Sequence, residues 1–245
     1  MSSSDYDRLY NNIYTKTEVD TLIENNSSNN MGFVTEEQLA NISNGSFTGL
    51  PIGYYWTIFG DVFRIMAHDQ FYGYNGINKH HIVVMQDTIY GFQKYNDTDT
   101  NSGGYSSSIL KNYIMQYNAY ITIIFGDNHV LSHTHDLTSG TYNSGTLTPT
   151  ANTKAWLINS YNVDGIRFDE ETIYNWQTAD KTQFPAFKND SNLKIGRRYG
   201  SANYWWLSTP RSINSKLFCY VASTGTVAGG LASNSYGVRP AFLLY

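Results

Sequence analysis

Histidines and a neighbouring carboxylate form the only cluster in this sequence that is typical of a metal site. His133, His135 and Asp136 lie within four residues, and His129 comes four residues earlier. In an extended segment the side chains of residues two apart point to the same face, so His133 and His135 could share one ion, or meet copies of themselves at a trimer axis. The segment borders a run of threonine, serine and glycine that gives no sign of such an axis. The sequence therefore favours no cofactor, with a metal at His133 and His135 as the weaker alternative.

Other reactive residues lack the partners that catalysis needs. His80 and His81 begin an apolar run, where one ring is expected to pack in the core. Glycosidases need two carboxylates at a defined spatial separation, which the acidic run at 169–171 does not establish; an acidic first helical turn explains it more simply. The single Cys219 lies in an apolar strand pattern, and no nucleophile elbow, P-loop or dinucleotide fingerprint occurs. We therefore expect no enzyme activity.

Composition limits the partners of the chain. Of its 245 residues only 15% are charged, while 21 are tyrosine, so a surface of tyrosine and small polar groups is expected. Such a surface suits sugar or protein contacts, although codon usage that enriches Asn, Tyr and Ile explains it equally well. The basic residues at 194–198 are too few for a nucleic-acid interface, and no apolar run reaches the roughly 18 residues of a membrane span. The start lacks a signal-peptide pattern, which predicts synthesis in the cytosol.

The first 48 residues repeat one small pattern 20 residues apart. Thr15 and Thr35 each precede a Glu or Gln by three residues, which is a capping box, and the pattern predicts short helices over 16–24 and 36–42. Helices this short are marginal alone, and the apolar stripe needs a partner. The polar linker at 25–30 favours an outlying trimeric stalk or anchor over helices that cap the core. The candidate trimerisation residues are Leu9, Ile13, Val19, Leu22 and Ile23.

Residues 49–245 are expected to form one α+β head domain with antiparallel sheet and long loops. A hairpin is predicted over 54–65 with its turn at Gly60-Asp61, and a buried strand over 81–85. Apolar residues at helical spacing predict a helix over 106–119. A long surface loop is predicted over 133–153, and a short helix over 169–176. Strands are predicted at 204–207, 217–222 and 238–244, separated by glycines.

The last predicted strands contain residues with clear structural requirements. Gly237 suits a close backbone approach or a positive φ, and Pro240 belongs at an edge or bulge. Arg239 lies among apolar residues and must be paired if it is buried, so a structural role is favoured over ligand binding. Trp205 and Trp206 face opposite sides of a strand, so one is expected in the core and the other as a possible surface anchor.

Three segments taken together carry a resemblance to a known family. They are residues 41–56 (NISNGSFTGLPIGYYW), 80–85 (HHIVVM) and 204–211 (YWWLSTPR), the last followed by 236–242 (YGVRPAF). This set resembles uncharacterised domains of phage structural proteins and bacterial surface proteins. The ending also resembles the C-type-lectin-like fold of phage receptor-binding proteins, in which a Gly-x-Arg closes the sheet. Residues 14–23 (YTKTEVDTLI) are similar to a segment common in phage tail and fibre proteins.

The resemblance implies where a ligand would bind. In C-type-lectin-like heads the loops around the last strands form the ligand face, and their aromatic and small polar residues resemble a paratope. Ordinary solvated loops explain the same residues equally well. No acidic cluster there predicts calcium. The candidate ligand-binding residues are Tyr204, Trp206, Arg211, Asn214, Lys216, Asn234 and Tyr236, and the loops also carry Ser212, Ser215, Ser223, Thr224 and Ser235.

From the resemblance we expect a homotrimeric fibre protein of a bacteriophage virion, on its tail or head. Its N-terminus would attach to other virion proteins, and its heads would bind a host surface glycan or protein without cleaving it. The first alternative is a purely structural head fibre, capsid decoration or baseplate component. The second is a depolymerase that acts on surface polysaccharide.

Overall fold

The computed structural model describes residues 29–140, 144–166 and 174–245. Apolar strands after Gly49 build a first sheet of five antiparallel neighbours. The predicted buried strand at 81–85 is confirmed, because all five residues of its third strand are buried. The strands lie in the order β1 (Tyr55–Ile58), β2 (Asp61–His68), β3 (Ile82–Gln86), β14 (Ala241–Leu244) and β7 (Ala155–Trp156).

The hairpin of β1 and β2 is confirmed, but its turn lies one residue earlier than predicted. Ile58 pairs with Asp61, so the two turn residues are Phe59 and Gly60. Both have positive φ, at 54° and 83°, which fits the right-handed twist of a two-residue hairpin. Asp61 is the first residue of β2 and not part of the turn.

A second five-stranded sheet is built mainly from the end of the chain. Its order is β12 (Val227–Leu231), β11 (Leu217–Val221), β10 (Trp205–Pro210), β13 (Ser235–Val238) and β4 (Gly91–Lys94). All neighbours are antiparallel except β10 and β13. The strands predicted at 204–207 and 217–222 are confirmed. Strand β12 was not predicted, because Gly229 and Gly230 inside it resemble a turn.

The two sheets are joined by a pair of strands that runs through both. β3 leads to β4 and β13 leads to β14, and these segments pair with one another in each sheet. The strand predicted over 238–244 is therefore two strands, interrupted at Arg239 and Pro240, where the chain leaves the second sheet for the first. Pro240 lacks a donor, and its place at this break fits the expectation from sequence.

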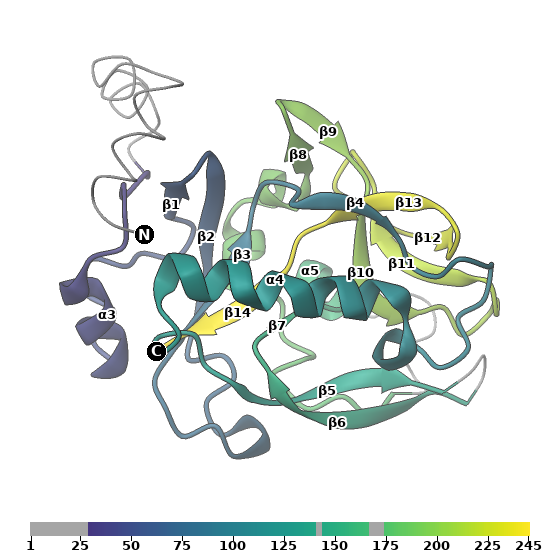
Figure 1. Cartoon of the computed structure of the whole chain (residues 1–245), viewed down its shortest axis with the longest axis horizontal. Helices are drawn as coiled ribbons and strands as arrows, with labels where there is room; N and C mark the ends of the chain where they lie inside the picture. Colours follow the sequence, from purple (N-terminus) through teal and green to yellow (C-terminus); the bar gives the residue numbers. More distant parts are fainter. Residues whose placement is uncertain (1–28, 141–143, 167–173) are drawn as a thin grey trace.

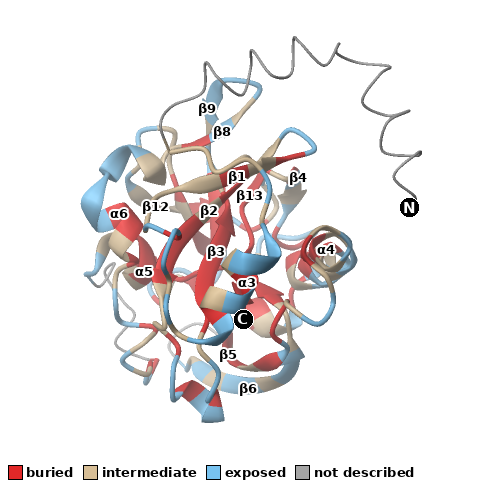
Figure 2. Ribbon diagram, turned by 90° about the vertical axis from the view of Figure 1, so that its left-hand side faces the viewer, coloured by how far each residue is buried: buried red, intermediate tan, exposed pale blue. Residues whose placement is uncertain are grey.

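Helices and loops cover both faces of the sheets (Figure 2). The helix α4 (Ile109–Phe125) packs on one side, and it extends the helical pattern predicted at 106–119. The short helices α5 (Ser160–Asp164) and α6 (Pro185–Asn189) lie on the other side, and Figure 2 shows buried β2 and β3 between the two layers. Trp206 joins the core under α4 and Trp205 the opposite core. Both indoles are fully buried, so the expected surface anchor at this pair is wrong.

Residues 133–139 and 146–153 pair as two antiparallel strands, so the long surface loop predicted over 133–153 is wrong. The strand β5 (His133–Ser139) pairs with β6 (Thr146–Thr153) along one side of the molecule (Figure 1). Threonine is a good strand former, and β6 is largely exposed, so the apolar alternation that marks a half-buried strand is missing. The remaining elements are the hairpin β8 (Gly196–Arg198) and β9 (Ser201–Asn203) and the 3-10 turns η1 (Tyr74–Gly76), η2 (Tyr105–Ser107) and η4 (Ser191–Lys194).

The helix predicted at 36–42 is confirmed as α3 (Glu36–Ser43), and its capping box is formed by Thr35 and Gln38. Its apolar side packs on the chain's own core, where Leu39 and Ile42 are buried. Of the two arrangements considered for this helix, capping the core is therefore the one observed, and its assignment to a separate anchor at 1–48 is corrected. The helix predicted at 16–24, the five trimerisation candidates and most of the segment at 169–176 lie outside the described residues.

The fold class is α+β, with several antiparallel sheets and long connections. Within the described ranges, no helix is long and apolar enough to cross a membrane.

Candidate functional site

Three tyrosines from the second sheet gather on one exposed face, and we call them the tyrosine surface. Tyr204 precedes β10, Tyr220 lies in β11 and Tyr236 in β13. The ring centre of Tyr204 lies 5.4 Å from that of Tyr220 and 5.3 Å from that of Tyr236, and the last two are 4.8 Å apart. Tyr204 is 44% exposed, and the other two are half-buried. The predicted candidates Tyr204 and Tyr236 are therefore neighbours, and Tyr220 joins them.

The sheet beneath these rings is packed closely against two of them, Tyr220 and Tyr236. A β-carbon at Gly230 would lie 2.8 Å from the ring of Tyr236 and 3.0 Å from that of Tyr220, so this position requires a residue without a side chain. Trp206 packs 4.5 Å from Tyr236, and its indole nitrogen donates to the carbonyl of Gln93. Trp206 is completely buried, which corrects its prediction as a ligand contact: it supports the surface from below.

Hydrogen bonding fixes the outer edge of the tyrosine surface. The amide nitrogen of Asn234 donates to the hydroxyl of Tyr236 over 2.8 Å, so Asn234 is a positioning residue and the tyrosine keeps its own proton to donate outward. Burial, with smaller effects of Tyr236 and Tyr204, raises the pKa of Tyr220 above its ordinary value. Tyr220 therefore offers a neutral hydroxyl group, and the surface as a whole offers ring faces.

The loop at 211–217 carries three more predicted residues, and it lies apart from the tyrosines. The aliphatic part of Arg211 covers Gly229, which faces the side of the sheet opposite to Gly230 because successive residues of a strand alternate. Arg211 therefore does not share a face with the tyrosine surface. Asn214 and Lys216 are exposed, whereas Ser212 is buried and is corrected as a contact residue.

A buried asparagine holds this loop in one conformation. The amide nitrogen of Asn101 donates to the carbonyls of Arg211, Asn214 and Leu217 at 2.9, 3.0 and 3.1 Å, and its backbone nitrogen donates to Ser215. The loop is rigid for this reason, although its exposed side chains do not converge on one point. Sequence reasoning missed Asn101, because it lies more than a hundred residues before the loop.

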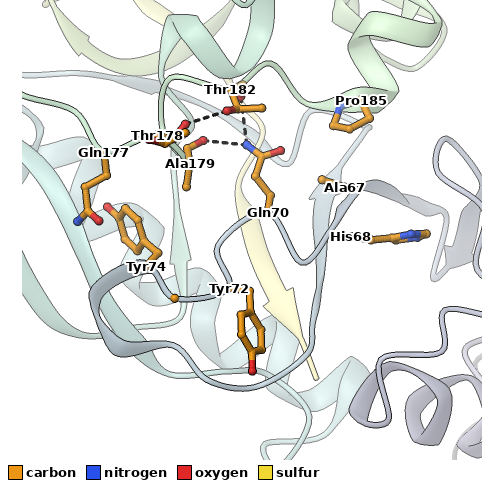
Figure 3. Close-up of a pocket in the computed structure, with 11 residues that line it drawn as sticks. Ala67, His68, Gln70, Tyr72, Tyr74, Gln177, Thr178, Ala179, Thr182 and Pro185 are labelled. Carbon is orange, nitrogen blue, oxygen red and sulfur yellow. Dashed lines mark hydrogen bonds between the residues drawn. The ribbon is translucent and has the colours of Figure 1, made fainter.

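A cleft of about 500 Å³ lies in a different part of the molecule, near the end of β2 (Figure 3). Small-molecule sites commonly have volumes of about 300–1,000 Å³. The residues that line it are Ala67, His68, Gln70, Tyr72, Gly73, Tyr74, Gln177, Thr178, Ala179, Thr182 and Pro185. The sequence alone did not point to this cleft, because its two walls are about a hundred residues apart.

A partly buried polar network lies behind one end of the cleft. The carboxylate of Asp136 accepts hydrogen bonds from Asn75 and Gln177 at 3.2 and 2.8 Å. The backbone nitrogen of Asp136 donates to the hydroxyl of Tyr74. His135 packs between Tyr74 and Trp156, at 5.4 and 4.5 Å between ring centres. These contacts make the hairpin β5–β6 a rigid support for the cleft.

The predicted metal pair belongs to this network. The rings of His133 and His135 are joined by a 3.3 Å contact between nitrogens, and both residues are buried inside the chain. Because both rings are buried inside one chain, they are not placed to meet copies of themselves at a trimer axis. No group of three or more ligands suited to a metal occurs in the parts of the chain that the structure describes. Burial lowers the pKa of His133 to about 4 and that of His135 well below 6.5.

The remaining reactive residues have structural contacts. The carboxylate of Asp69 contacts the ring of His80 at 2.6 Å and accepts from the backbone nitrogen of His81 at 2.8 Å. His81 is fully buried, as expected for one of the pair, and Cys219 is buried in β11. The acidic run at 169–171 lies outside the described residues.

The described residues form an α+β domain built on two five-stranded sheets, with an aromatic face and a separate cleft. Residues 79–245 match the family described as a domain of unknown function, DUF6273, and the chain belongs to this family. The structural core begins before the matched residues, since Leu39, Trp56 and Phe63 are part of it. No curated protein and no solved structure matches the chain.

Proposed function

We propose that this chain is a bacteriophage virion fibre protein, on the tail or the head of the particle, whose head domain binds a host surface glycan or protein without cleaving it. The tyrosine surface carries the proposal, because its rings and hydroxyl groups are supported by close packing on the sheet below. Preorganised aromatic groups of this kind lose little conformational entropy when they bind. The virion location rests on the resemblance of residues 14–23 and of the C-terminal segments to phage proteins.

The head is further proposed to be a C-type-lectin-like domain. In support of this, the chain returns to the first sheet at its end, with β14 inserted between β3 and β7. The break at Arg239 follows Gly237, whose β-carbon would lie 2.9 Å from the carbonyl of Tyr204, so the Gly-x-Arg sequence stands at a close approach of two strands.

Trimerisation through residues 1–28 is proposed to raise the strength of attachment. Weak heads that are linked in one particle gain avidity, because the second and third bind at a high effective concentration. The candidates Leu9, Ile13, Val19, Leu22 and Ile23 would supply the contacts between copies.

Adsorption of variant particles to the host bacterium tests the binding role. Tyr204→Ala removes the most exposed ring of the tyrosine surface, and a contact of the hot-spot kind is worth about 2 kcal/mol or more. Tyr199→Ala is the matched control, since Tyr199 is 93% exposed in the turn between β8 and β9. We expect strongly reduced adsorption for Tyr204→Ala and normal adsorption for the control, with equal melting temperatures of the purified proteins.

Other outcomes favour the alternative roles. Normal adsorption of Tyr204→Ala particles, together with protein located on the capsid shell by imaging, would support a structural role in decoration. Release of oligosaccharide from host capsule by the purified protein would contradict the non-enzymatic proposal and favour a depolymerase.

A further inference from the structure

We infer that the cleft between Tyr72 and Gln177 is a binding site for a neutral saccharide, separate from the tyrosine surface. Figure 3 shows Gln177 and Tyr74 at one end of the cleft, and Ala67, His68 and Pro185 at the other. Figure 3 shows Gln70 extending from the loop after β2 toward Ala179 and Thr182, and the ring of Tyr72 extending from the same loop in the opposite direction.

The charge of the lining indicates an uncharged ligand. None of its eleven residues is a lysine, arginine, aspartate or glutamate. Burial lowers the pKa of His68 below 6.5, so this ring is also neutral at pH 7. A charged ligand would lose its hydration on entering the cleft and would find no residue of opposite charge in the lining, which is unfavourable. The chemistry therefore selects against phosphates, carboxylates and basic peptides.

Both cleft glutamines are held so that their amide oxygens remain as acceptors. The amide nitrogen of Gln177 donates to Asn75 and to the carboxylate of Asp136, each at 2.8 Å. The amide nitrogen of Gln70 donates to the carbonyls of Ala179 and Thr182 at 2.9 and 3.1 Å. Carboxylate and carbonyl oxygens only accept, so the orientation of both amides is fixed by chemistry. Figure 3 shows the oxygen of Gln70 directed away from these two bonds.

An aromatic ring completes the set of groups that a sugar requires. Tyr72 is 52% exposed, and His80 stacks on it at 5.1 Å between ring centres, which holds the ring in place. A pyranose has an apolar face of C–H groups and an edge of hydroxyl donors. The ring of Tyr72 fits the first, and the fixed amide oxygens of Gln70 and Gln177 fit the second. Together with the absence of charge in the lining, this combination favours a saccharide over a peptide.

Saturation-transfer NMR on the full chain tests the inference with a defined set of probes. The probes are glucose, galactose, N-acetylglucosamine, N-acetylgalactosamine and fucose, with glucose 6-phosphate as the charged comparison. We expect transfer to at least one neutral sugar and none to the phosphate. Tyr72→Ala should weaken that binding about tenfold or more, by loss of the stacking surface.

A second variant blocks the cleft from an exposed position. Thr178→Trp should abolish sugar binding, because the new ring fills the space beside Gln70, whereas Thr224→Trp, in the exposed turn after β11, should leave it unchanged. Melting temperatures of the purified variants show that each is folded.

The outcomes separate this site from the tyrosine surface. Sugar binding that is lost in Tyr72→Ala and kept in Tyr204→Ala supports the cleft, whatever the adsorption assay shows. The inference is overturned if none of the neutral sugars binds, if binding survives both Tyr72→Ala and Thr178→Trp, or if short peptides compete for the cleft while sugars do not.

Discussion

Arg239 forms an ion pair with Asp87 at the point where the chain passes between the two sheets. Arg239 is completely buried, and its guanidinium also donates to the carbonyl of Leu193 over 3.1 Å. Arg64 donates to the other oxygen of Asp87 at 2.6 Å. Burial lowers the pKa of Arg239 to about 10, with Asp87 opposing the shift, so the guanidinium is still charged at pH 7. The structural role expected for Arg239 is thus confirmed, and its partner is Asp87.

Removing Asp87 should destabilise the fold strongly. Asp87→Ala leaves Arg239 as a buried cation without its counter-ion, which commonly costs about 3–5 kcal/mol of unfolding free energy. Arg64→Met is the matched control: it keeps the pair of Asp87 and Arg239, and should cost about 1–2 kcal/mol. Urea unfolding followed by tryptophan fluorescence measures both. If Asp87→Ala lowers the free energy of unfolding by less than 1 kcal/mol, the ion pair does not stabilise the connection between the two sheets.

The two adjacent glycines of β12 should respond differently to alanine. At Gly230 the new carbon would meet the rings of Tyr220 and Tyr236, which cannot move far, so we expect a loss of about 1–3 kcal/mol and weaker receptor binding. At Gly229 it would meet the flexible side chain of Arg211, which can move aside. Urea unfolding and particle adsorption compare the two. Equal effects would indicate that the tyrosines are not held by close packing.

The sequence predicted correctly those elements that are determined by interactions between residues close together in the chain. Thr35 and Gln38 lie three residues apart, and their capping box forms as expected because both partners belong to one turn. The buried strand β3 was predictable from its uninterrupted apolar residues. Where the helix packs was not predictable, because the apolar side that carries Leu39 fits another copy as well as the chain's own core.

The candidate site could be predicted only in part, for the same physical reason. Tyr204 and Tyr236 flank the last strands and resemble binding residues, whereas Tyr220 lies among apolar neighbours in β11 and resembles a core residue. The cleft joins Gln70 with Ala179 through a contact across 109 residues of sequence. Such contacts depend on how the two sheets are joined in space. The spacing of residues along the sequence does not reveal that arrangement.

Acidification should destabilise the head through its buried histidines. The pKa of His133 is about 4 in the folded chain and about 6.5 when unfolded, so the unfolded state binds more protons as the pH falls below 6.5. This contribution is present above pH 6.5 and is lost as the pH falls toward 4. For His133 alone we expect about 2 kcal/mol less stability at pH 5 than at pH 7.

Urea unfolding at both pH values measures this loss. His133→Gln should be less stable at pH 7 but should show a smaller difference between the two pH values. A variant with the same pH dependence as the wild type would assign the effect to His135, His81 or His68, whose pKa values are also lowered by burial.

Trimer formation should depend on the apolar residues before Asn29 and not on α3. In the full chain, Val19→Asp with Leu22→Asp places charges on the proposed contact stripe, where burial without a partner is strongly unfavourable. Light scattering should then change from three times the 27.8 kDa of one chain to a single chain. The melting temperature of the head should stay the same, because its described core begins at α3. A wild-type chain that is monomeric at micromolar concentration would contradict the trimer, and with it the avidity that the proposed attachment requires.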